Sequence, residues 1–244
     1  MNSDLLFLLI LPVVAFFYAA VGHGGASGYL ALMALFSFTP DEMKPTALLL
    51  NLFVAAISFF HFWKSGFFNG KLFLFFAIGS IPLAYFGGLF DIDTHLYKIT
   101  LGLLLLFAIA KMLNVFGEES TEIRKVKWFE GVFVGGIIGF FSGLIGIGGG
   151  IILSPVILLM KWGKMKEAAA VSALFIWVNS ASGMVGQLTK GIDLHPKSWL
   201  FVLLAVIGAY LGGLFGSSKL NNTSLRYLLA FVLILASIKL VFIP

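Results

Sequence analysis

Cysteine and charge are the two features that this sequence has least of. Its 244 residues include no cysteine, which excludes a disulfide framework, thiol chemistry and a metal site built on thiolates. Only 11% of the residues are charged, whereas 60% are hydrophobic and the mean hydropathy is +1.04. A soluble domain of this length needs far more polar surface, so the composition predicts a protein embedded in a lipid bilayer. The net charge of +5 is too small to indicate nucleic-acid binding, and we interpret it as a sign of membrane orientation.

Carboxylates are also missing from the middle of every apolar run. This absence excludes a buried Asp/Glu proton relay and a cation pathway lined with acids. Basic residues avoid the centres too, apart from Lys111 and Lys239, whose long side chains can snorkel to an interface. The sequence therefore indicates no cofactor and no metal site, and an anion would be held by dipoles and neutral donors. The acidic residues all fall in loops or at segment ends: Asp4, Asp41, Glu42, Asp91, Asp93, Glu118, Glu119, Glu122, Glu130, Glu167 and Asp193.

Long apolar runs make up most of the chain. Because lipid cannot satisfy backbone polar groups, such runs must form helices or a closed barrel. They are too long and too uniformly apolar for barrel strands, which alternate over about 10 residues. The predicted fold class is an all-α integral membrane protein with five hydrophobic segments in each half. The segments cover approximately residues 5–21, 28–39, 46–63, 72–90, 96–116, 129–145, 150–161, 167–188, 198–216 and 224–243.

The chain contains an internal sequence repeat that divides it into two similar halves. The sequence AYFGGLF at residues 84–90 recurs as AYLGGLF at 209–215, and GHGG at 22–25 recurs as GIGG at 146–149. Matching pairs keep their order, which chance does not explain. We therefore predict a first transmembrane repeat over residues 1–116, a charged cytoplasmic linker over 117–128 and a second repeat over 129–244. The paired glycines at 87–88 and 212–213 lie in full-length segments and indicate close helix contact.

The second segment of each half is too short to cross a bilayer. At about 12 residues it reaches roughly 18 Å, against a hydrocarbon core of about 30 Å. Each short segment follows a glycine cluster directly, and this combination in two repeats is typical of broken helices at a transporter's substrate site.

The basic residues predict the topology. If all ten segments cross, one side receives 11 basic residues and the other 5, out of the 16 in the chain. Re-entrant short segments give a weaker bias, and this alternative stays open. The stronger bias favours termini that both face outside, and five crossings per half make the two repeats inverted.

The two glycine clusters are the first candidate site. Consecutive glycines before a helix permit a tight turn and leave backbone N–H groups free at the positive end of the helix dipole, which suits an anion. Packing alone would scatter small residues along one helix face. His23 is the titratable member, able to bind or to take up a proton, although Ile147 replaces it in the second half. The cluster residues in this prediction are Gly22, His23, Gly24, Gly25, Ser27, Gly146, Gly148, Gly149 and Gly150.

Polar residues inside apolar segments complete the predicted site. Amides are costly to place in lipid, so Asn51 and Asn179 are better candidates than single serines, which often bond to their own helix. We expect Asn51, Ser172 and Asn179 to reach the oxygens of a small anionic substrate near the membrane midplane. A channel-like permease for another small solute is the main alternative.

A membrane enzyme and a structural scaffold are the rivals from other classes. The sequence GASG at residues 25–28 matches the short Gly-x-Ser-Gly pattern of rhomboid-type intramembrane proteases, with Ser27 as the nucleophile. Such a serine needs a base within hydrogen-bond reach, and His23 and His61 are the only mid-membrane candidates. The duplication gives no reason for a protease site in one half alone, so we do not favour an enzyme.

The sequence FFSGLIGIGGG at residues 140–150, with its weaker copy at 21–28, resembles the sulfite exporter TauE/SafE family, also called the toluene-sulfonate uptake permease family. The resemblance covers nearly the whole chain. It implies transport of sulfite, organosulfonates or related sulfur anions across the cytoplasmic membrane of a prokaryote. Substrates vary within the family, so the motif leaves the anion, the direction and the oligomeric state open.

Overall fold

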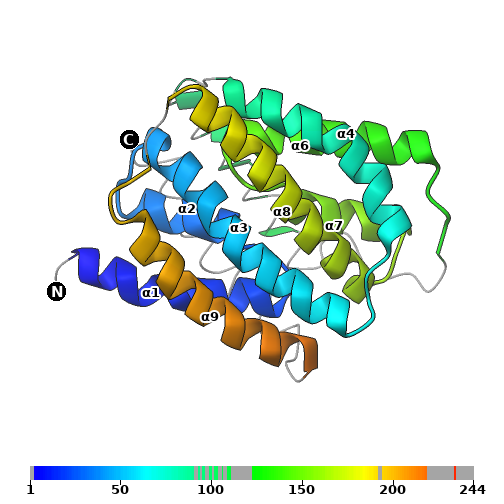
Figure 1. Cartoon of the computed structure of the whole chain (residues 1–244), viewed down its shortest axis with the longest axis horizontal. Coiled ribbons are helices and arrows are strands. Elements are labelled where there is room, and N and C mark those ends of the chain that lie inside the picture. Colours follow the sequence, from blue (N-terminus) through cyan, green and yellow to red (C-terminus); the bar gives the residue numbers. More distant parts are fainter. Residues whose placement is uncertain are drawn as a thin grey trace.

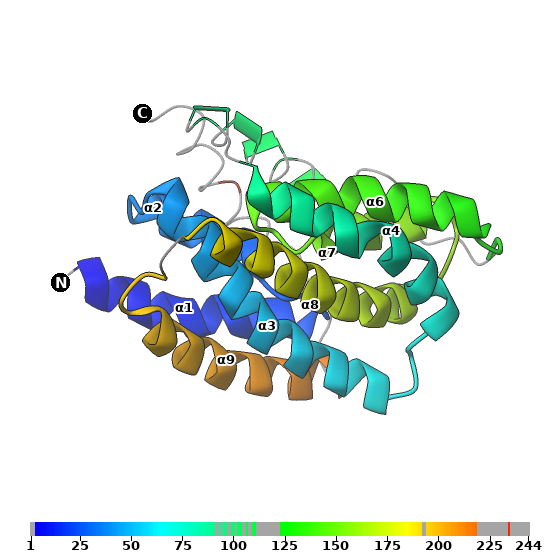
Figure 2. The same ribbon diagram turned by 45° about the horizontal axis from the view of Figure 1, so that its top comes forward.

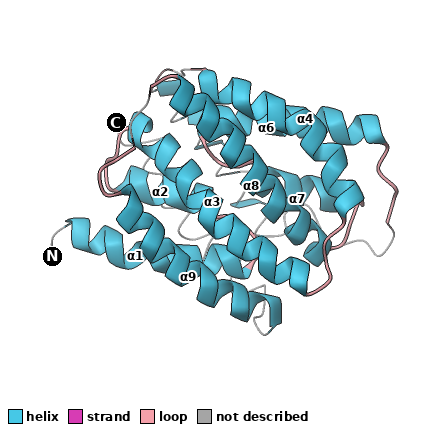
Figure 3. Cartoon of the chain, in the orientation of Figure 1, coloured by secondary structure: helices cyan, strands magenta, loops and turns pink. Residues whose placement is uncertain are grey.

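The computed structural model describes residues 3–90, 123–191 and 194–218, together with a few residues between 93 and 110 and residue 234. Within these residues the chain is built of helices and loops, without a strand (Figures 1 and 3). This confirms the all-α prediction for the described part. The helices are α1 (Ser3–Ala20), α2 (Ala26–Leu35), α3 (Pro40–Lys64), α4 (Gly70–Leu89), α6 (Trp128–Ile145), α7 (Gly150–Leu159), α8 (Met165–Thr189) and α9 (Ser198–Ser218).

Helices of the second half repeat the lengths of those in the first. Both α1 and α6 have 18 residues, both α2 and α7 have 10, and both α3 and α8 have 25. In each pair, the helix of the second half begins 124 or 125 positions after that of the first half. The two short segments are thus short helices, as the sequence predicts, and at 1.5 Å per residue each is about 15 Å long.

Two outer pairs of helices flank a central pair. In Figures 1 and 2, α1 lies beside α9 along one side and α4 beside α6 along the other, with α3 and α8 between them. Glycines make the outer contacts close. A β-carbon at Gly87 or Gly143 would collide with backbone across the α4–α6 contact, and one at Gly212 would collide with the Phe16 carbonyl of α1. The packing role predicted for the glycines at 87–88 and 212–213 is confirmed.

Directions of neighbouring helices follow from the same contacts. Positions 12, 16 and 20 of α1 meet positions 208, 212 and 216 of α9 in order, so these two helices run parallel. Positions 76, 80 and 84 of α4 meet positions 135, 139 and 143 of α6 in the same way. In the central pair, Leu48 lies near Gly183 and Asn51 near Ser180, so α3 and α8 run antiparallel.

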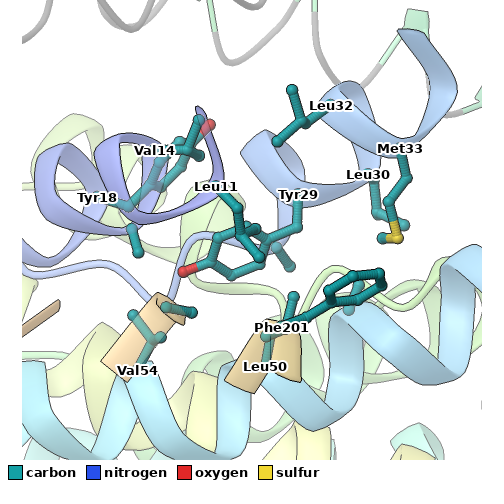
Figure 4. Packing of buried hydrophobic residues seen from close by; sticks show 14 of the residues in the cluster. Leu11, Val14, Tyr18, Tyr29, Leu30, Leu32, Met33, Leu50, Val54 and Phe201 are labelled. Atoms are coloured by element: carbon teal, nitrogen blue, oxygen red, sulfur yellow. The ribbon is translucent and has the colours of Figure 1, made fainter. Parts of the chain in front are cut away.

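The short helix α2 is buried on nearly all sides. Residues 26–34 are all buried, and Tyr29 lies among Leu11 of α1 and Leu50 and Val54 of α3 (Figure 4). A helix that is apolar all round is typical of the interior of a larger bundle. The bundle therefore presents the first turn of α2 to the interior of the protein and not to lipid.

Five of the described helices are long and apolar enough to cross a membrane, namely those at Pro40–Lys64, Gly70–Leu89, Trp128–Ile145, Lys166–Thr189 and Ser198–Gly216. The apolar helix at Leu5–Ala20 is shorter. Large apolar side chains such as Phe133, Leu203 and Ile207 are exposed on the outer face, as expected of a surface that meets lipid. Residues 117–122, which are half of the predicted linker 117–128, lie outside the described residues, as do much of the segment 96–116 and all of the segment 224–243 except residue 234.

Candidate substrate site

Each glycine cluster forms a turn between a full helix and a short one. After α1, Gly22 has a φ of 77° and Gly25 caps the N-terminus of α2 with a φ of 96°. After α6, Gly146 ends the helix with a φ of 84° and Gly149 caps α7 with a φ of 79°. Residues with a β-carbon rarely adopt this left-handed backbone, which is why glycines recur here. Gly25 and Gly149 have no side chain. They therefore cannot accept hydrogen bonds from the first backbone N–H groups of the short helix that follows.

The two turns meet at the crossing of α3 and α8. A β-carbon on Gly24 would lie 2.7 Å from Ile176 and 2.8 Å from the Asn51 Oδ1 atom. One on Gly148 would lie 2.7 Å from Ile176, 2.6 Å from Asn51 Nδ2 and 3.0 Å from Ser180 Oγ. The same two side chains therefore separate the turns. Clusters that are 124 residues apart in sequence border one small region of the interior.

The residues around this region lie at equivalent positions of the two halves, but their residue types differ. Ile176 follows Asn51 by 125 positions, and Ser180 follows Ala55 by the same number. Gly24 faces Asn51, Ile176 and Ala55, whereas Gly148 faces Asn51, Ile176 and Ser180. The first half thus contributes the amide and the second half the hydroxyl. At each of these two pairs of equivalent positions, one half has a polar residue and the other half an apolar one.

Asn51 is fully buried, and its amide carries the polarity of the crossing. Its Nδ2 atom donates to Ser180 Oγ at 3.1 Å, while its Oδ1 atom has no hydrogen-bond partner among the described residues. An amide nitrogen has two hydrogens, so one remains after the bond to Ser180. A buried polar atom without a partner costs free energy, commonly about 1–3 kcal/mol, unless a ligand or water meets it. Asn51 therefore keeps unused hydrogen-bonding capacity at the crossing, with one hydrogen on Nδ2 and the Oδ1 acceptor.

His23 links the first turn to the second half of the chain. Its Nε2 atom lies 3.2 Å from Ser154 Oγ of α7, and Ser154 in turn bonds to Ser172 Oγ of α8 at 2.8 Å. The His23 Nδ1 atom lies 3.0 Å from the Val21 carbonyl oxygen, and Ser58 of α3 donates to the His23 carbonyl at 3.3 Å. Among the predicted site residues, His23 and Ser172 are thus brought together through Ser154.

Ser27 and Asn179, two other predicted site residues, form hydrogen bonds to residues other than Asn51 and His23. The Ser27 hydroxyl lies 2.8 Å from the Tyr18 hydroxyl, and the described hydrogen bonds of the His23 ring go to Val21 and Ser154 rather than to Ser27. Asn179 is buried and donates to the Phe175 carbonyl of its own helix at 2.8 Å. A role for Asn179 in substrate binding stays a prediction.

Sequence reasoning missed three residues beside the turns. They are Ser154 and Ser180, which are polar residues inside apolar segments, and Lys44, which precedes such a segment. Lys44 is only 6% exposed, packs against Gly146 and donates from Nζ to the Phe90 carbonyl at 3.3 Å. Helical periodicity could not assign these residues, because the contacts join different helices. For Lys44 alone a signal was present, because the Met-Lys pair at residues 43–44 recurs at 165–166.

Two apolar grooves lie on the outer surface, away from the turns. One of about 470 Å³ runs between α4 and α8 and includes Tyr85 and Trp177. The other, of about 440 Å³, runs between α4 and α6 beside Phe133. Their linings are almost entirely hydrocarbon and aromatic, so they resemble the rest of the lipid-facing surface and contain no residue of the glycine turns.

Membrane-length apolar helices around a buried polar crossing at two broken-helix turns are typical of a multi-pass membrane transporter. The chain belongs to the sulfite exporter TauE/SafE family, whose model matches residues 6–240. A probable membrane transporter protein of Sinorhizobium fredii is 36% identical to it, over 93% of this chain and 94% of the relative. Similar proteins of that description come from Methanocaldococcus jannaschii, at 29% identity over 83% and 82%, and Bacillus subtilis, at 26% over 84% and 82%. No solved structure matches the chain.

Proposed function

We propose that this protein is a secondary transporter for a small anion of the sulfite and organosulfonate class. The observation that carries the proposal is the meeting of both glycine turns at Asn51. Uncapped first turns of α2 and α7 supply the positive ends of two helix dipoles, each equivalent to about half a charge. The second hydrogen of the Asn51 amide and the hydroxyl of Ser180 supply neutral donors. The name of the family, sulfite exporter, supports sulfur as the central atom of the substrate.

A panel of solutes in proteoliposomes tests this function. We expect purified protein to carry sulfite and methanesulfonate. Dimethyl sulfone has nearly the size of methanesulfonate but no charge, so it should not compete, and neither should the cation methylammonium. Protein-free vesicles correct for passive leak. Competition by dimethyl sulfone equal to that by methanesulfonate would show that charge is not recognised and that the anion assignment is incorrect. Conductance of many ions at channel-like rates would favour the permease alternative.

We further propose that the two halves are inverted repeats in the cytoplasmic membrane of a prokaryote, with both termini outside. Antiparallel α3 and α8, which are equivalent helices, support inversion. The 11-to-5 division of basic residues supports the orientation with both termini outside. The prokaryotic origin of the relatives supports the cytoplasmic membrane of a prokaryote as the location. Under this topology the first turns of α2 and α7 approach the substrate from opposite sides of the membrane.

Reporter fusions test the topology. A fusion at Pro244 should show an external location, and one near Glu122 a cytoplasmic location, because the linker and the C-terminus are separated by five crossings. Paired reporters that are active only inside or only outside serve as mutual controls. A cytoplasmic signal at Pro244 would contradict the inverted ten-crossing arrangement.

A further inference from the structure

The hydrogen bonds of His23 depend on whether its imidazole is charged. A carbonyl oxygen accepts hydrogen bonds and cannot donate them, so the Nδ1 atom facing Val21 at 3.0 Å carries a hydrogen. The Nε2 atom faces the Ser154 hydroxyl at 3.2 Å. That hydroxyl has one hydrogen to give. It is directed either to Nε2 or, over 2.8 Å, to Ser172.

Two proton arrangements satisfy the same heavy-atom positions. When Ser154 donates to Ser172, Nε2 must donate to Ser154, and the imidazole then has hydrogens on both nitrogens and a positive charge. When the imidazole is neutral, Ser154 instead turns its hydrogen to Nε2. The charge of His23 therefore changes by the rotation of one hydroxyl, without any movement of the helices. Imidazole is also the side chain whose ordinary titration falls near neutral pH.

We infer that His23 is the proton-binding group of a proton-coupled anion transporter. This rests on the proposed function and adds its coupling ion. A proton from the water on one side adds to the lone pair of Nε2, and the same bond breaks when the proton leaves to the water on the other side. His23 adjoins Gly24, which contacts Asn51, so an imidazolium lies beside the proposed anion site. Proton and anion then favour each other's binding by the same factor, and a monovalent anion crosses without net charge.

The surrounding elements leave His23 as the titratable group at this position. α7 has no titratable side chain, and on α1 the Tyr18 hydroxyl meets Ser27. α2 contributes the buried Tyr29. On α8, Lys166 lies over the Phe67 ring and Glu167 accepts from Asn69 at 2.6 Å. On α3, the buried Lys44 lies beside the second turn and donates to the Phe90 carbonyl. His61 and Lys64 are in the last turn of α3, where His61 packs against Gly213 of α9. The second turn has Ile147 at the equivalent place, so the repeat supplies one such group and not two.

Methanesulfonate in proteoliposomes is the appropriate probe, because its charge does not change with pH. With the membrane potential held at zero, a gradient of one pH unit should drive about a tenfold accumulation by the wild type if one proton accompanies each anion. Added methanesulfonate should also acidify the vesicle interior, as read by an enclosed pH dye. His23→Gln retains a polar side chain that cannot become a cation. It should reach equal concentrations on both sides without accumulation. His61→Gln, the matched control, should accumulate as the wild type does.

The outcomes separate the two proposals. Accumulation by His23→Gln equal to the wild type would place the proton elsewhere and overturn the inference. Wild-type equilibration that ignores the pH gradient, without internal acidification, would also overturn it and leave an uncoupled anion carrier. Failure of the wild type to carry any of the tested anions would overturn the proposed function, and the inference with it. The acidification measurement uses wild-type protein alone, so it decides whether transport is proton-coupled even if His23→Gln does not fold.

Discussion

Gly148→Val is expected to abolish anion transport while the protein still inserts and folds. The φ of Gly148 is 71°, and a β-carbon there would meet Asn51, Ile176 and Ser180 at distances of 2.6 to 3.0 Å. A branched side chain would therefore fill the crossing of α3 and α8 and push the two turns apart. Transport of methanesulfonate into proteoliposomes measures the effect, and size-exclusion chromatography in detergent measures the amount of folded protein.

Gly66→Val is the matched control for this substitution. Gly66 has nearly the same backbone, with a φ of 79°, but nothing lies within 4 Å of the position of its β-carbon. Both variants thus pay the backbone strain of a left-handed residue, about 1–2 kcal/mol, and only one of them fills the candidate site. Gly24→Val, which would collide with Ile176 and Asn51 from the other turn, should behave like Gly148→Val. Normal flux in both turn variants would show that these glycines serve helix packing and not substrate binding.

Local patterns were enough to predict the helices and the turns. The short helices at Ala26–Leu35 and Gly150–Leu159 lie within two residues of the predicted starts at 28 and 150. Glycines before each of them signalled the turn, because positive φ is a local property of the backbone. The close packing at Gly87 and Gly212 was likewise readable from the repeated motif. In each case the signal and the structure occupy the same few residues.

Contacts between the halves were not readable in this way. Asn179 and Ser180 are neighbours on α8, but successive residues of a helix point about 100° apart. Which of them faces Asn51 depends on how α8 is rotated against α3, and that rotation is set by side-chain packing over the whole crossing. The contact between His23 and Ser154 joins residues 131 positions apart and has the same origin. An inexact internal repeat also hid Ile176 as the counterpart of Asn51.

Asn51→Ala is expected to weaken anion binding by about 1–3 kcal/mol, or roughly 5- to 150-fold in Kd. The substitution removes the single amide that borders both turns and leaves Ser180 without the donor now 3.1 Å away. Asn179→Ala is the comparison variant, because that amide donates to its own helix at Phe175. We expect the larger loss at Asn51. Competition with methanesulfonate at constant pH and potential measures both affinities. Equal Kd values for Asn51→Ala and the wild type would remove Asn51 from the site.

Asn51→Asp distinguishes an anion site from a cation site at the same crossing. Aspartate has the shape of asparagine, but its carboxylate only accepts hydrogen bonds and adds a negative charge between the two turns. Repulsion in this buried region should therefore abolish methanesulfonate binding, a greater loss than that of Asn51→Ala, in which the charge is absent. A folded Asn51→Asp protein that still binds the anion would contradict the proposed site. Binding of methylammonium by the wild type would instead identify the crossing as a cation site, with the Asn51 Oδ1 atom as a ligand.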